Sequence, residues 1–176
     1  MRKKLKRFKK TAHHEAGHAV ARHFLHLPYR YVTIESDEES LGHVERFPYP
    51  KSFCPDIDSE NYRVRKRIEK EIIASFAGHA AEFILSKRKN WKGARQDNHE
   101  TVDLALYYCG GSTEEAGAFL DWMWLRTIGW IKNPLRWMCV KKVAKELLEK
   151  HKLKATEVRK IIKEAIHKKF DVKKID

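Results

Sequence analysis

The chain has 176 residues, of which 42% are hydrophobic and 35% charged, and it carries a formal net charge of +13 at pH 7. One globular domain with enough chain for a core is expected at this length. The most apolar stretch, 116–131, is interrupted by Asp121 and Arg126, and it falls short of the ~20 residues needed to span a membrane. No apolar run follows the basic start, so we expect no secretory signal. Three scattered cysteines suit a reducing compartment, so we expect a cytoplasmic protein.

Much of the positive charge lies at the two ends of the chain. Lysine and arginine crowd the first ten residues, and more of them follow in 159–174. We expect residues 1–9 to form a basic tail, mobile or irregular, ahead of one domain over residues 10–176. An anionic partner would suit this charge. Because no nucleic-acid motif is visible, we favour a solvated tail and solvated helix faces.

Residues 10–26 are expected to form an amphipathic helix that carries His14-Glu15-Ala16-Gly17-His18. Two histidines four residues apart leave the same helix face, because four residues turn a helix by about 400°. A glutamate beside the first histidine can accept a proton from a zinc-activated water. The pattern therefore predicts a catalytic zinc site with His14 and His18 as ligands and Glu15 as general base. Gly17, a poor helix former, indicates that another segment approaches the helix closely.

Catalytic zinc usually takes a third protein ligand. A histidine six residues after His18 is excluded, because Phe24 stands there, and His23 is one position away and reads as a surface or capping residue. Glu38 lies at the distance that another subclass uses. It falls, however, between two strand-like runs, 30–35 and 41–47, at what looks like a hairpin tip, so it is a weak candidate.

The rest of the chain is expected to be mostly helical. A proline-rich loop, 47–55, should lie beside the cleft, and a long helix should follow over 59–87. Three more helices are expected at their capping signals: Ser112 with Glu115, Asn133 with Pro134, and Thr156 with Glu157. We expect most tryptophan side chains of the first two of these helices to be buried in the core. Trp122 and Trp124, two residues apart, cannot both face the same way.

Four blocks of the sequence, in order, resemble the peptidase domain of FtsH, the membrane-anchored AAA zinc protease. They are His14 to Val20, the strand pair Val32-Thr33-Ile34 and Leu41-Gly42-His43-Val44, the helix block Ala77-Gly78-His79-Ala80-Ala81-Glu82, and Gly93-Ala94-Arg95-Gln96-Asp97. The resemblance covers about residues 11–108 well and the rest loosely. It implies a mostly helical α+β peptidase domain of the zincin type, with a short strand pair beside the active helix.

The resemblance also implies roles for particular residues. It makes Asp97 the third zinc ligand and Glu82 a partner that holds one ligand histidine through its other ring nitrogen. Taken from the residues alone, Asp97 also suits a helix N-cap, and Glu82 suits an ordinary helix-face carboxylate. His99 and Asp103 are nearby alternatives for the ligand role, although His99 suits an exposed first-turn position better.

The sequence lacks the parts with which that family delivers substrate to the peptidase domain. No Gly-x-x-x-x-Gly-Lys-Ser/Thr loop is present, so the AAA module is missing from these residues, and no membrane anchor is visible. We expect a zinc-dependent endopeptidase acting on unfolded polypeptide, either free-standing, as a homo-oligomer or with a separate ATPase. The alternative is a non-catalytic zinc protein that uses its basic surface on an anionic partner. The intact Glu15 favours the enzyme, because a structural zinc site needs no base.

Substrate is expected to lie as an added strand beside residues 41–47, with Leu41, Gly42, His43 and Val44 in contact with it. Gly42 would let a substrate backbone approach closely. His43 stands where the FtsH family usually has tyrosine.

Overall fold

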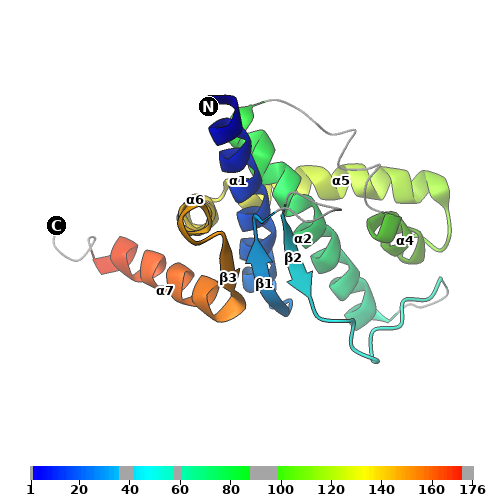
Figure 1. Cartoon of the computed structure of the whole chain (residues 1–176). Coiled ribbons are helices and arrows are strands. Elements are labelled where there is room, and N and C mark those ends of the chain that lie inside the picture. The colour runs from blue at the N-terminus through cyan, green and yellow to red at the C-terminus, as the bar shows by residue number, and fades with distance from the viewer. Residues whose placement is uncertain (1, 36–41, 58–60, 88–98, 172–176) are drawn as a thin grey trace.

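The computed structural model describes residues 2–35, 42–57, 61–87 and 99–171. Within them the chain is mostly helical with one small sheet, which confirms the expected α+β class (Figure 1). The elements in chain order are α1 (Arg2–Phe24), β1 (Tyr29–Thr33), β2 (His43–Arg46), α2 (Tyr62–Ser86), α4 (His99–Tyr108), α5 (Thr113–Lys132), α6 (Pro134–Lys150), β3 (Lys152–Lys154) and α7 (Ala155–Asp171). No helix in this part of the chain is both long and apolar enough to cross a membrane.

Helix α1 begins earlier than the sequence pattern indicates. The irregular lead expected over residues 1–9 is wrong, because α1 is helical from Arg2 onward. Lysine and arginine are good helix formers, and no glycine or proline interrupts the chain before Gly17. The helix that carries His14 and His18 therefore also includes the basic residues at the N-terminal end of the chain.

The sheet has three antiparallel strands in the order β2-β1-β3. The expected pair β1–β2 is confirmed, and β3 is an addition that the sequence pattern did not indicate. Val32 of β1 lies opposite Val44 of β2 and opposite Leu153 of β3. Val32 and Leu153 are fully buried, so this apolar row joins the sheet to the core.

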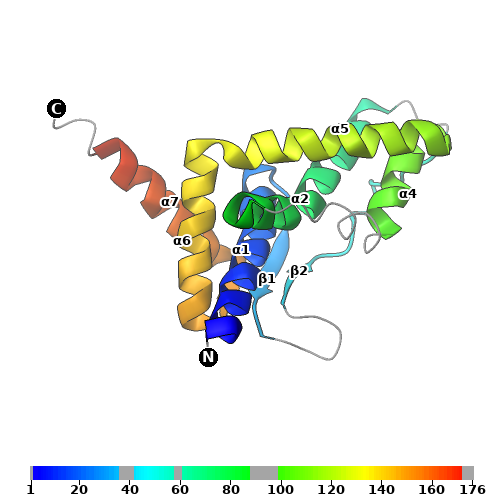
Figure 2. The same cartoon turned by 90° about the horizontal axis from the view of Figure 1, so that it is seen from above.

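Helix α1 runs through the middle of the molecule, with α2 on one side and α6 on the other (Figures 1 and 2). Small residues on α1 allow this close packing. A Cβ on Gly17 would lie 2.5 Å from the Ala77 carbonyl oxygen, so only glycine permits α1 and α2 to approach so closely. The close approach expected at Gly17 is confirmed.

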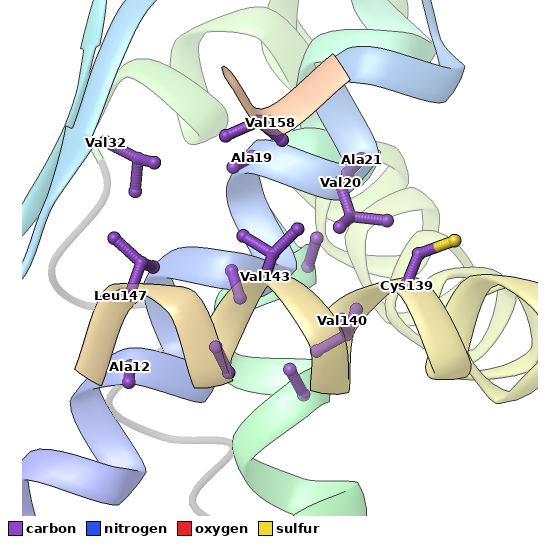
Figure 3. Packing of buried hydrophobic residues seen from close by; sticks show 14 of the residues in the cluster. Ala12, Ala19, Val20, Ala21, Val32, Cys139, Val140, Val143, Leu147 and Val158 are labelled. Atoms are coloured by element: carbon purple, nitrogen blue, oxygen red, sulfur yellow. The ribbon is translucent and has the colours of Figure 1, made fainter. Parts of the chain in front are cut away.

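The side of α1 that faces α6 belongs to an apolar core shared with α7 and the sheet (Figure 3). Its fully buried members include residues of α1, α6 and α7: Ala12, Ala19, Val20, Val140, Val143, Leu147 and Val158. A second apolar cluster joins α2, α4 and α5 around Phe76 and Met123. The first cluster also contains Ala74, Ala77, Ala80 and Ala81 of α2, so α2 contributes to both clusters.

The helix starts expected at Ser112 and at Asn133-Pro134 are confirmed, whereas α7 begins at Ala155, one residue before the expected Thr156, and Glu157 accepts a hydrogen bond from the Lys154 backbone N–H. The Ser112 side chain accepts a hydrogen bond from the Glu115 backbone N–H, and Asn133 caps α6 with Pro134 in its first turn. The two tryptophans of α5 point different ways, as expected. Trp124 packs on Phe76 with ring centroids 5.9 Å apart, whereas Trp122 is 50% exposed.

Candidate metal and catalytic site

His14 and His18 lie one turn apart on α1 and turn the same ring nitrogen toward each other. Their Nε2 atoms are 3.0 Å apart, and both residues line one cleft. Two nitrogens bound to one tetrahedral zinc at about 2.0–2.1 Å lie about 3.3 Å apart. The observed separation is close to that value, so the pair fits a shared metal ion with a small adjustment.

The other ring nitrogens of the pair are held by oxygen acceptors. His18 Nδ1 donates to the Ala74 carbonyl oxygen at 2.7 Å, and His14 Nδ1 donates to Glu82 Oε1 at 3.1 Å. A carbonyl or carboxylate oxygen can only accept, so each Nδ1 carries the proton. In the neutral rings both Nε2 lone pairs then face each other, an arrangement that a shared cation stabilises.

Burial favours the metal-binding form of His18. Burial, and secondarily the neighbouring His14, lower the pKa of His18 well below its ordinary value. The ring is therefore neutral at pH 7, the state in which imidazole binds metals. Burial alone would raise the pKa of Glu82, but hydrogen bonds with His14 and Lys10 leave that pKa lowered, so Glu82 is an anion that can orient His14.

Gly78 on α2 makes room for both imidazoles. A Cβ at this position would lie 2.3 Å from His18 Nε2 and 2.7 Å from His14 Nε2. Any larger residue would displace both rings. Glycine at position 78 therefore allows the His14 and His18 side chains to pass close to the α2 backbone.

Glu15 lies in the same cleft and is 4% exposed. Its Oε2 is buried and has no hydrogen-bond partner among the described residues. Burial raises the pKa of Glu15 to about 7, an effect that His14 opposes and Glu82 reinforces. A buried carboxylate with a free oxygen and a pKa near neutrality is suited to accept and return a proton.

The remainder of the cleft is walled by β2, α2 and α4. Gly42, His43 and Val44 line the side next to Glu15, and a Cβ on Gly42 would lie 3.1 Å from Glu15 Cγ. Ser75 and Thr101 hydrogen bond to each other at 2.8 Å on the opposite wall. β2 is an edge strand of the described sheet, so an extended chain laid along it would pass this lining.

Two ion-pair groups close the end of the cleft away from His14. Buried Arg22 of α1 donates to Glu71 Oε2 at 3.0 Å, and Arg67 binds the other oxygen of Glu71. A second group joins β2 to α4 across the cleft. Arg46 and Tyr49 both donate to Glu100, and the Arg46–Glu100 separation is 2.7 Å. The walls of the cleft are therefore tied together by charge.

The structure brings together several residues singled out in the sequence. The cleft is lined by His14, Glu15, His18, Gly42, His43 and Val44. Glu82 accepts a hydrogen bond from the His14 ring nitrogen that points away from His18. Asp97, Leu41 and Glu38 lie outside the described residues. The two alternatives to Asp97 on α4, His99 and Asp103, do not line the cleft.

His79 is a neighbour of His14 that sequence reasoning did not single out. Their ring centroids are 4.7 Å apart, and ligand atoms of His14, His79 and Glu82 all lie within 4.8 Å of one another. This second grouping competes for His14 with the His18 pair. The only sequence signal was that His79 follows Gly78 in the block that resembles the FtsH helix.

The sequence was also compared with known protein families and with curated proteins, and neither comparison finds a match.

Proposed function

We propose that the chain is a zinc-dependent endopeptidase of the kind that its resemblance to the FtsH peptidase domain implies. The observation that carries the proposal is the facing Nε2 pair of His14 and His18, 3.0 Å apart, beside the unpartnered Oε2 of Glu15. A metal pair and a buried base in one cleft are the minimum parts of this chemistry. Three free thiols suit a reducing, cytoplasmic setting.

His14 and His18 would hold zinc, with Asp97 as the third ligand. Bound zinc supplies Lewis acidity, which lowers the pKa of a water molecule to about 7 and polarises a peptide carbonyl. Glu82 and the Ala74 carbonyl keep both imidazoles in the required tautomer. These partners fix the direction of each ligand lone pair before any ion is bound.

Glu15 would act as the general base. Its free Oε2 accepts the proton of the attacking water, and the carboxylic acid so formed then protonates the departing amine. Burial that raises the pKa of Glu15 to about 7 lets the same group perform both transfers near neutral pH. A Cβ at Gly42 would lie 3.1 Å from Glu15 Cγ, so glycine at this position leaves room for the Glu15 side chain.

Substrate would bind as an extended chain along β2. An edge strand presents unpaired N–H and C=O groups, and β2 passes the histidine pair with Gly42, His43 and Val44 in the lining. Unfolded polypeptide therefore suits the cleft better than a folded domain. Unfolded casein should be cleaved, whereas a tightly folded domain of similar length should persist in the same incubation without ATP.

The central test combines metal content with catalysis. The purified chain should carry close to one zinc per molecule and cleave casein, and a chelator should abolish cleavage that added zinc restores. Glu15→Gln should keep zinc and fold but lose about 10²–10⁴-fold in rate. The control variant Glu114→Gln makes the same substitution at an exposed residue and should behave as the parent. Parent-level hydrolysis by Glu15→Gln would remove Glu15 as the base.

A ligand series separates the two possible metal groupings. Asp97→Ala and His18→Ala should both lose zinc, whereas His79→Ala should retain it. Glu82→Gln should weaken zinc binding by about 10–100-fold, because it orients His14 without binding the metal. Zinc lost with His79→Ala but kept with His18→Ala would move the site to the His14–His79–Glu82 group and contradict the cleft assignment.

A further inference from the structure

Helix α5 has a second face that is exposed in the described part of the chain. Its inward side carries the buried residues Ala116, Leu120, Met123, Thr127 and Ile131. On the outward side, exposed residues recur at alternating spacings of three and four. They are Glu115, Ala118, Trp122, Leu125, Gly129 and Lys132. This spacing is that of a helix seam that packs against another helix.

The middle of this outer seam is strongly exposed and carries two large apolar side chains, Trp122 and Leu125, with the Arg126 guanidinium 5.0 Å from the Trp122 ring centroid. Trp122 is 50% exposed and Leu125 is 67% exposed, although most of the large apolar side chains of α5 are at least partly buried. A Cβ added to Gly129 would meet no heavy atom within 4 Å, so the surface beside Leu125 is open. Figure 2 shows α5 as an outer helix along one side of the molecule, accessible from that side. An apolar seam in such a place indicates a protein partner.

We propose that the outer seam of α5 binds the same seam of a second copy of this chain, with the two helices antiparallel about a two-fold axis. Centring the axis between Met123 and Trp124 pairs each seam residue with another seam residue. Trp122 then meets Leu125 of the second copy, and Ala118 meets Gly129. The small pair leaves space beside the large pair, as interlocking side chains require.

Charge selects the antiparallel arrangement. In this register Glu115 of each copy faces Lys132 of the other copy. Each end of the paired seam therefore holds one negative and one positive side chain. A parallel pair would instead place Glu115 against Glu115 and Lys132 against Lys132, which is repulsive. Lys132 Nζ is 6.0 Å from the Phe83 ring centroid, near the limit of a cation–π contact, and its flexible stem leaves the amine available. The seam is thus complementary to itself only in one direction.

The expected dimer is weak. One helix pair buries less than the roughly 1,200–2,000 Å² of a standard stable interface, so a Kd on the order of micromolar is expected. The seam lies on α5, away from the cleft between α1, α2 and β2, and no residue of the seam lines that cleft. This inference therefore does not depend on the proposed peptidase activity.

Sedimentation velocity on the full chain over about 1–200 µM tests the proposal directly. The parent should shift from monomer to dimer with concentration. Leu125→Glu should weaken dimerisation at least tenfold, because it places a carboxylate in the apolar centre. Ile57→Glu, at a 49% exposed apolar residue elsewhere, should dimerise as the parent does. Circular dichroism should show unchanged helicity for both variants.

A charge exchange distinguishes the proposed register. Glu115→Lys alone and Lys132→Glu alone each create like-charge pairs and should raise the Kd by about threefold to tenfold. The double variant Glu115→Lys with Lys132→Glu restores opposite charges and should return close to the parent Kd. Failure of the double variant to recover would overturn the antiparallel register.

A parent chain that stays monomeric at about 200 µM would overturn the proposal as a whole, since a weak interface of this size should be populated there. So would a dimer that Leu125→Glu does not weaken, because its interface would lie elsewhere. Both measurements require no metal and no substrate, so their failure is distinguishable from failure of the peptidase assignment.

Discussion

The two sides of α1 use the same helix in opposite ways. Toward α6, Ala12, Ala19 and Val20 are fully buried among apolar side chains, and no polar contact is needed. Toward the cleft, His14, His18 and Arg22 are each held by a particular oxygen. The apolar side depends on shape and volume, whereas the cleft side depends on each polar group keeping its partner.

This contrast indicates where the chain can be altered without changing its chemistry. Substitutions on the α6 side should change stability and leave the site intact. Substitutions on the cleft side should act through single lost partners. Variants on each side test that division.

Glu71→Ala should destabilise the fold by about 3–5 kcal/mol, because Arg22 would remain buried without its carboxylate. Urea denaturation followed by circular dichroism measures the loss. The double variant Arg22→Met with Glu71→Leu removes both charges and should recover most of the stability. A loss below about 1 kcal/mol for Glu71→Ala would show that the ion pair is not a buried constraint.

Leu147→Ala should cost about 2–5 kcal/mol, since this fully buried side chain fills the α1–α6 core. The same denaturation series measures it, and zinc bound per folded chain should not change. Ile57→Ala, at a half-exposed position, is the control and should stay within about 0.5 kcal/mol of the parent. Zinc lost together with Leu147 would mean that the two sides of α1 are not separable.

Gly78→Ala should weaken zinc binding by at least about tenfold, equivalent to about 1.4 kcal/mol, because its methyl group would displace both imidazoles. Competition with a coloured chelator measures the affinity. Gly129→Ala is the matched control, since no heavy atom lies within 4 Å of a Cβ at that position. An unchanged affinity in Gly78→Ala would show that the rings have room to move, against the packing described above.

Ser112 lies on neither side of α1, so Ser112→Ala measures how much stability an ordinary surface substitution costs. It removes the cap of α5 and should cost about 1 kcal/mol in the same urea series. Thr113→Ala, whose hydroxyl donates to the exposed Glu114 side chain, should cost less. Equal losses would mean that the Ser112 hydrogen bond contributes little.

Much of the fold followed from local sequence signals. Helix starts at Ser112 and Asn133-Pro134 were predictable because a capping side chain acts on backbone within three residues. Strand β3 was not, because Lys152-Leu153-Lys154 holds one apolar residue and forms only through pairing with β1. The helical start of α1 was missed because its basic composition resembles that of a solvated tail.

The candidate site divides in the same manner. The spacing of His14 and His18 is sufficient to put both imidazoles on one helix face, because helix geometry is local. Which atoms hold the rings depends on packing between distant helices. Ala74, Gly78 and Glu82 come from α2, more than 50 residues along the chain, and only the packing of α2 on α1 places them at the ring nitrogens. His79 beside His14, and the bridge from Arg46 to Glu100, likewise arise from contacts between distant segments, for which no local pattern exists.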